Sequence, residues 1–206
     1  KIAKRFKTSV TVRGAGTSLV GSALNKGIIL DMKNFDSIRM SKNHVTVGPG
    51  TIKGKLDNSL KKSKKFFPPN PSIGSFCAIG GMLGNNSSGS RSLKYGSMID
   101  NVIGVTFVDG NGIKHTLPKD KKIAEKILEI TKKIDNKKIP IVTKNSSGYR
   151  IDKIKTINDA HKIIIGSEGT LGVILSAKLK IRDIPKKRIL IIIEYKSIMS
   201  ALKNCI

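Results

Sequence analysis

The feature that most constrains this fold is a short glycine loop, Val12-Arg13-Gly14-Ala15-Gly16-Thr17-Ser18-Leu19. It follows the β-branched stretch 8–12, which predicts a strand. Two glycines in three residues let the backbone turn sharply and present free N–H groups, and the next two residues add hydroxyl donors. Such a loop can hold a phosphate through its oriented amides, and a plain glycine turn between two strands has the same pattern.

The residues after this loop exclude two common nucleotide-binding motifs. A G-x-G-x-x-G fingerprint needs a third glycine at position 19, which is Leu19. It also needs a helix directly after the loop, whereas residues 27–30 predict another strand. No Gly-Lys-Ser or Gly-Lys-Thr ends the loop. The sequence therefore excludes a nicotinamide-type Rossmann site and a Walker loop.

The order of strands and helices predicts an α+β fold with mixed sheets flanked by helices, because hairpins outnumber long helices. A hairpin is expected over 37–47, and a second one over 102–117 surrounds the turn Asp109-Gly110-Asn111-Gly112. An amphipathic helix is expected over 121–134. Further strands are expected at 162–165, 173–181 and 188–195.

We expect two lobes and the start of a further domain. Residues 1–49 would form the first lobe, incomplete at its N-terminus, and residues 50–183 the second. Residues 184–206, which follow Ile184-Pro185, would begin a substrate or cap domain that is cut short.

The chain is strongly basic, with 39 Lys and Arg against 14 Asp and Glu and a net charge of +25. The lysines are scattered, aromatic residues make up 4% and Trp is absent, so no stacking platform for specific nucleic-acid binding is expected. The charge favours a lysine-rich solvated surface, with peripheral attraction to an acidic membrane as the alternative. No stretch approaches the roughly 18 apolar residues of a membrane span.

The cysteines and histidines predict neither a disulfide framework nor a metal site. Cys77 and Cys205 are far apart, and His44, His115 and His161 each stand alone without zinc-like spacing. The start of the chain lacks the apolar core of a signal peptide. We therefore expect a cytoplasmic protein, with the inner face of the membrane as a second location.

Three later segments share the polar, glycine-rich character of the first loop: 68–74, 80–89 and 166–173. Each alone is compatible with an ordinary connecting loop. Together they offer amide donors for a diphosphate, hydroxyls and side-chain amides for a polyol, and glycines where the backbone meets a flat ring.

In this order the four segments resemble the flavin-binding domain of the vanillyl-alcohol oxidase and p-cresol methylhydroxylase (PCMH-type) superfamily. The resemblance points to the branch of D-lactate dehydrogenase, glycolate oxidase and D-2-hydroxyglutarate dehydrogenase, and it spans residues 8–181. It is carried by 12–19, 67–72, 79–96 and 165–173, and residues 145–150 also fit this branch.

The resemblance implies bound FAD. Thr17 and Ser18 stand where some members carry the histidine that attaches the flavin, so it implies non-covalent FAD. Glu168 would lie near the cofactor, either as a partner of backbone amides or on a ribose. The residues implied to bind FAD are Arg13, Gly14, Ala15, Gly16, Thr17, Ser18, Pro71, Ser72, Gly81, Gly84, Asn85, Ser88, Gly89, Glu168, Gly169, Gly172 and Val173.

The same resemblance implies an FAD-dependent dehydrogenase that oxidises a D-2-hydroxy acid of the D-lactate, glycolate or D-2-hydroxyglutarate type to the 2-oxo acid. Hydride would pass to the flavin, and electrons would leave to a quinone, a cytochrome or an electron-transfer flavoprotein. The alternative is a non-catalytic flavin-binding subunit of a multi-subunit oxidase.

The sequence does not identify the hydroxy-acid substrate, the electron acceptor or the oligomeric state. The catalytic base is also unidentified, and it and any metal ligands are expected beyond Ile206. Arg91, Lys94, Tyr149 and Arg150 could contact a substrate carboxylate.

Overall fold

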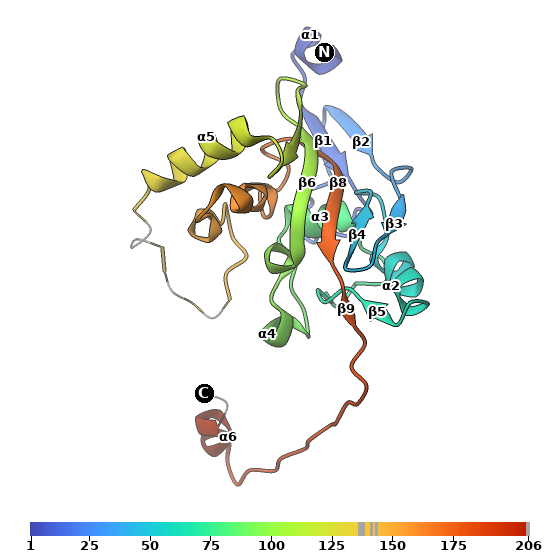
Figure 1. Cartoon of the computed structure of the whole chain (residues 1–206), viewed down its shortest axis with the longest axis vertical. Coiled ribbons are helices and arrows are strands. Elements are labelled where there is room, and N and C mark those ends of the chain that lie inside the picture. Colours follow the sequence, from blue (N-terminus) through green and yellow to red (C-terminus); the bar gives the residue numbers. More distant parts are fainter. Residues whose placement is uncertain (136–138, 141, 143, 205–206) are drawn as a thin grey trace.

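A computed structural model describes residues 1–135, 139–140, 142 and 144–204. An antiparallel five-stranded sheet lies at its centre, and two parallel strands lie beside it (Figure 1). The strands are β1 (Val10–Arg13), β2 (Ile28–Asp31), β3 (Ile38–Met40), β4 (His44–Val47), β5 (Lys65–Phe66), β6 (Val102–Val108), β7 (Lys114–Leu117), β8 (Val173–Lys180) and β9 (Arg182–Asp183). The helices are α1 (Ile2–Arg5), α2 (Lys53–Lys61), α3 (Ile79–Gly84), α4 (Ser92–Tyr95), η1 (Met98–Asn101), α5 (Lys121–Lys132), η3 (Ile151–Lys153), η4 (Ile157–Ile164) and α6 (Ile198–Asn204).

The large sheet has the strand order β3-β4-β8-β6-β7. Both predicted hairpins are confirmed, as β3–β4 and β6–β7. The two hairpins are joined by β8, which pairs with β4 through Val45 and Leu179 and with β6 through Val105 and Ala177. These four side chains are buried and belong to the core. The α+β prediction is thereby confirmed.

The five-stranded sheet contains strands from both predicted lobes. Strands β3 and β4 precede residue 49, yet β4 pairs with β8, which lies in the predicted second lobe. The division at 49 stays a prediction, and the five-stranded sheet draws strands from both sides of it.

Two predicted strands are wrong. Residues 162–165 are the end of the 3₁₀ helix η4 and Ile165 after it, because Thr156 and Asp159 form a capping box at its start. The helical spacing buries Ala160 and Ile164 toward the core. Residues 188–195 form neither helix nor strand, since no strand among the described residues pairs with them.

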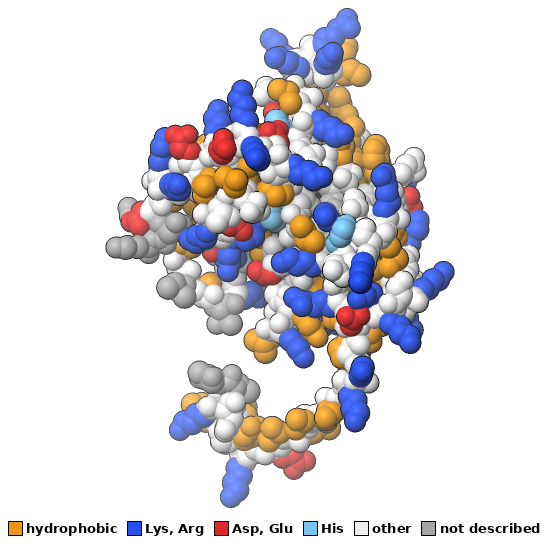
Figure 2. Space-filling view, viewed as in Figure 1, with side chains coloured by type: hydrophobic (Ala, Val, Ile, Leu, Met, Phe, Trp, Pro, Cys, Tyr) orange, Lys and Arg blue, Asp and Glu red, His pale blue; other side chains and the backbone are white. Residues whose placement is uncertain are grey.

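The chain after β9 runs away from the body toward α6 (Figure 1). Its apolar residues 189–193 are 63–85% exposed, and they form the orange band on that extension in Figure 2. Lys and Arg side chains are spread over the rest of the visible face rather than gathered in one place (Figure 2). Cys205 falls outside the described residues.

A tight loop connects the sheet to α2. Gly50 approaches the chain after β2 so closely that a β-carbon there would lie 1.9 Å from the carbonyl oxygen of Met32. Its N–H donates to the carbonyl of Phe35 at 2.9 Å. Only a residue without a side chain fits such an approach.

Replacing Gly50 with Ala should therefore lower the free energy of unfolding by about 1–3 kcal/mol, the usual cost of overpacking a buried site. The matched control is Gly110→Ala in the β6–β7 turn, where a β-carbon meets nothing within 4 Å. That control should change stability by less than about 0.5 kcal/mol. Urea unfolding of both variants checks this, and equal losses would contradict it.

A second prediction concerns His115, whose ring nitrogens lie 3.0 Å from Asp120 Oδ2 and 3.3 Å from Asp109 Oδ2. The hydrogen bond with Asp120, followed by that with Asp109, raises the pKa of His115 above its ordinary 6.5. A raised folded pKa stabilises the fold below the unfolded pKa, and this stabilisation is lost as the pH rises through the folded value. Wild type should exceed His115→Gln in stability most near about pH 5.5, and the difference should shrink by about pH 8.5.

The control for this titration is His44→Gln. Burial, and then the charge of Lys178, lower the pKa of His44. Its protonation therefore destabilises the fold at low pH, and this destabilisation disappears as the pH rises through the unfolded pKa. Urea unfolding across the pH range measures both differences. A His115 difference that does not change with pH would refute the assignment.

Candidate flavin site

The predicted phosphate loop follows β1 and presents unused donors. Within the described part of the chain, none of the backbone N–H groups of residues 14–18 donates a hydrogen bond. Gly16 has a positive φ of 70°, and a β-carbon there would lie 3.0 Å from Nη2 of Arg13. The Arg13 guanidinium thus lies against the loop and forms no ion pair with a described residue. Free amides beside a cation suit an anionic ligand.

This loop lies on helix α3. A β-carbon at Gly14 would be 2.9 Å from Cβ of Ala78 and 3.8 Å from the backbone nitrogen of Gly81. The N–H of Gly81 has no acceptor among the described residues, and a β-carbon at Gly81 would meet nothing within 4 Å. Helix α3 therefore adds the N–H of Gly81 to the free donors of the loop, and the space over Gly81 is open.

The fourth predicted segment lies at the other end of α3. The N–H of Gly166 donates to the carbonyl of Leu83 at 2.9 Å, and that of Glu168 donates to the carbonyl of Gly84 at 3.0 Å. These bonds satisfy helix carbonyls that have no partner within the helix. Glu168 has a positive φ of 51°, and its side chain is exposed. The structure thus shows that the N–H of Glu168 binds the end of α3, and it assigns no partner to the exposed carboxylate among the described residues.

The second and third segments lie directly against each other. A β-carbon at Gly89 would be 1.8 Å from the carbonyl oxygen of Asn70 and 2.7 Å from the nitrogen of Pro71. The side chains of Ser72, Asn85 and Ser88 form no hydrogen bond with any described residue. Their hydroxyls and amide are therefore available to a polyol or phosphate.

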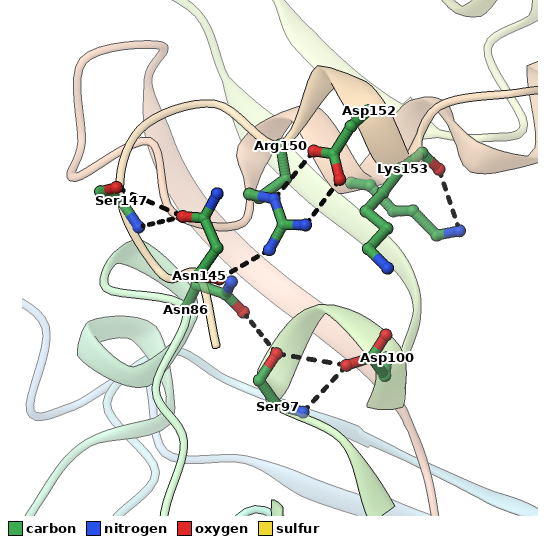
Figure 3. Close-up of polar contacts among 9 residues, drawn as sticks. Asn86, Ser97, Asp100, Asn145, Ser147, Arg150, Asp152 and Lys153 are labelled. Carbon is green, nitrogen blue, oxygen red and sulfur yellow. Dashed lines mark hydrogen bonds and ion pairs between the residues drawn. The ribbon is translucent and has the colours of Figure 1, made fainter. Parts of the chain in front are cut away.

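Two polar networks fix the loops around α3 (Figure 3). Asn86 is fully buried, and its Oδ1 accepts from Oγ of Ser97 at 3.2 Å and from the N–H of Ile99 at 3.0 Å. Arg150 donates to both carboxylate oxygens of Asp152, at 2.8 and 2.6 Å, and to the carbonyl of Asn145 at 2.6 Å. The Arg150 guanidinium lowers the pKa of Asp152.

These contacts narrow the four candidates for a substrate carboxylate. Arg150 is held by Asp152, and the hydroxyl of Tyr149 lies 2.6 Å from Oγ1 of Thr170, so both hold loops together. The cations of Arg91 and Lys94 stack instead on aromatic rings, 5.3 Å from the centroid of Phe66 and 5.6 Å from that of Tyr95. Of the three cationic candidates, Arg91 and Lys94 have no carboxylate partner among the described residues, whereas Arg150 has Asp152.

The last two predicted residues are placed by the sheet. A β-carbon at Gly172 would lie 2.2 Å from the carbonyl oxygen of Val108, and Val173 pairs with Val108 across β6 and β8. Gly169 has open space around it. The contacts described above thus join the first loop and residues 166–168 to α3, the second segment to the loop after α3, and Gly172 and Val173 to β6.

No histidine of the described chain is identified as a catalytic base. His44 and His115 lie in strands, and His161 is buried with its ring nitrogens 3.0 and 3.1 Å from the carbonyl oxygens of Asn158 and Val102. Burial lowers the pKa of His161. Among the described residues, no three His, Cys, Asp or Glu side chains are grouped as metal ligands. In the same residues, no helix has the length and apolar character that a bilayer crossing requires.

Sequence reasoning missed two residues that build this arrangement. Pro49 accepts at its carbonyl from the N–H of Gly80 at 2.8 Å, so the loop before α2 supports the start of α3. Lys53 is completely buried next to Asn70. The first could have been suspected from Gly-Pro-Gly before a helix, whereas no sequence signal distinguishes Lys53 from the other lysines.

Comparisons with known proteins agree with this geometry. The D-2-hydroxyglutarate dehydrogenase of Escherichia coli (strain K12) is 34% identical over 94% of the chain. The mitochondrial D-lactate dehydrogenase [cytochrome] of Arabidopsis thaliana is 29% identical over 98%, and the glycolate oxidase subunit GlcD of Bacillus subtilis (strain 168) is 28% identical over 98%. The chain spans 22%, 31% and 38% of the length of these relatives, respectively.

A solved structure shares the fold. The 6-hydroxy-D-nicotine oxidase from Arthrobacter nicotinovorans superposes with a TM-score of 0.64 at 18% identity, over 88% of this chain and 33% of that one. This likeness confirms the predicted PCMH-type fold. Residues 1–117, more than half of the chain, match the family described as FAD binding domain, and the chain therefore belongs to that family.

Proposed function

We propose that this chain is the FAD-binding part of an oxidoreductase that oxidises a D-2-hydroxy acid to the 2-oxo acid. The observation that carries the proposal is the convergence on α3 of N–H groups that have no acceptor among the described residues, from residues 14–18 and from Gly81, beside the Arg13 cation. The resemblance to enzymes named for D-2-hydroxyglutarate, D-lactate and glycolate supports the substrate class.

In this proposal the first loop and Gly81 bind the pyrophosphate through backbone N–H groups, and Arg13 balances its charge. Ser72, Asn85 and Ser88 donate to the sugar chain, while Gly84 lets the backbone approach the ring and Gly89 lets Asn70 pack against this loop. FAD bound there would supply the hydride acceptor for the carbon that bears the hydroxyl. Positions 17 and 18 are Thr and Ser rather than the histidine that attaches the flavin in some members, which supports non-covalent binding.

The partners and location are part of the same proposal. The proposed electron acceptor is a quinone, a cytochrome or an electron-transfer flavoprotein. The proposed location is the cytoplasm, and the net charge of +25 supports association with the acidic inner face of the membrane. Arg91 and Lys94 are the cations that could contact a substrate carboxylate, since both lack a carboxylate partner in the described chain.

The first test is the visible spectrum of the protein purified from the complete gene, before and after anaerobic D-lactate, glycolate and D-2-hydroxyglutarate. We expect flavin bands that one acid bleaches, and we expect denaturation to release the flavin. Flavin bands that no acid bleaches would favour the non-catalytic subunit. Absence of flavin after FAD has been added would refute the proposed function.

A steric test uses the open space over α3. Gly81→Leu places a side chain where a β-carbon meets nothing, and it removes a helical glycine, so the apoprotein should unfold at an unchanged or higher temperature. The same side chain fills the space assigned to the pyrophosphate, so FAD binding should be lost. The control Gly110→Leu is equally open and lies in the β6–β7 turn. Normal FAD binding by Gly81→Leu would show that the pyrophosphate lies elsewhere.

A further inference from the structure

Lys53, in the first turn of α2, is completely buried. A buried ammonium is costly unless it is paired and hydrogen-bonded. Its Nζ contacts the Asp57 carboxylate one helical turn later and donates to Oδ1 of Asn70 at 3.4 Å. The ammonium group of Lys53 thus contacts Asn70, at the start of the turn that contains Pro71 and Ser72.

The rest of the Lys53 side chain supports the same turn. Its backbone N–H donates to the carbonyl of Cys77 at 2.9 Å, and its Cδ lies 3.4 Å from the position of a β-carbon at Gly74. Lys53 therefore lies along the inner side of residues 70–77 and does not reach the predicted cofactor itself.

Asn70 connects Lys53 to the loop 84–90. An ammonium has only donors, so the side-chain oxygen of Asn70 must face Lys53, and its Nδ2 must face the other way. There Nδ2 donates to Oγ of Ser90 at 3.2 Å. The carbonyl of Asn70 lies against Gly89. The orientation of one amide therefore aligns residues 70–72 with residues 84–90.

The pair is poorly explained by stability alone. Oδ1 of Asp57 is buried and has no hydrogen-bond partner in the described chain. The Lys53 side chain is 0% exposed, whereas the Asp57 side chain is 38% exposed. A buried charge whose partner is partly solvated is often no more stabilising than an apolar residue of the same volume. A role in aligning the two loops accounts for the burial of Lys53.

We propose that Lys53 is a positioning residue for the cofactor. Through Asn70 it fixes the turn 70–72 against the loop 84–90 and thereby sets the affinity for FAD. This inference rests on the proposed function, because both segments are assigned to FAD there. Lys53 touches neither cofactor nor substrate, so its loss acts through the geometry of the loops.

The test uses full-length protein and two readouts, the Kd for FAD of the apoprotein by fluorescence titration and the stability of the apoprotein in urea. The double variant Lys53→Met/Asp57→Asn removes both charges and leaves no lone buried ion. Its Kd should rise about tenfold, as for the loss of one charge-assisted hydrogen bond. Asn70→Ala, at a partly exposed position, should raise the Kd as much, and combining it with the double variant should add nothing further.

The matched control is Leu60→Ala, which truncates another fully buried side chain of α2. It should lower the stability without changing the Kd for FAD. An unchanged Kd in the double variant or in Asn70→Ala, or an equal rise in Leu60→Ala, would overturn the positioning role while the proposed function stands. Failure of wild type to bind FAD would instead refute the proposed function and this inference with it.

Discussion

The arrangement of the loops at the candidate flavin site depends on α3, a six-residue helix whose terminal N–H and C=O groups need hydrogen-bond partners outside the helix. At the start of α3, the N–H groups of Ile79 and Gly80 donate to carbonyls of Thr51 and Pro49. At its end, residues 166 and 168 donate to its last carbonyls. A buried helix end without such partners costs several kcal/mol in lost hydrogen bonds, so these bonds hold distant parts of the chain together around one short element.

Glycine makes these approaches possible and also leaves donors free. Gly14, Gly80 and Gly89 each lie so near another backbone or Ala78 that a side chain would clash. Gly81 is the exception, since it has open space above it and an N–H without an acceptor in the described chain. The same residue type thus serves two purposes on one helix: close contact on one side and an exposed backbone on the other.

The basic residues of the chain fall into two groups, those on the solvated surface and those paired inside the molecule. Most of the 39 basic residues are solvated, and their number says little about the fold. A few are used inside the molecule. Arg150 is fixed by Asp152 and also donates to the carbonyl of Asn145, and Lys53 is fixed by Asp57 and also donates to Asn70. Paired charges at such places orient loops, because a charged hydrogen bond is directional and costly to break when buried.

The sequence by itself determined the two hairpins, the α+β class and the glycine-rich segments, because alternating apolar residues and turn glycines act locally. It misassigned residues 162–165, where a capping box and burial against the sheet favoured a helix, and residues 188–195, where an apolar run has no partner strand in the described chain. Only the tertiary structure showed which loops meet at α3, and why Lys53 differs from the other lysines. Such contacts join residues far apart in the chain, and the burial and hydrogen bonds that define them exist only once the segments have come together.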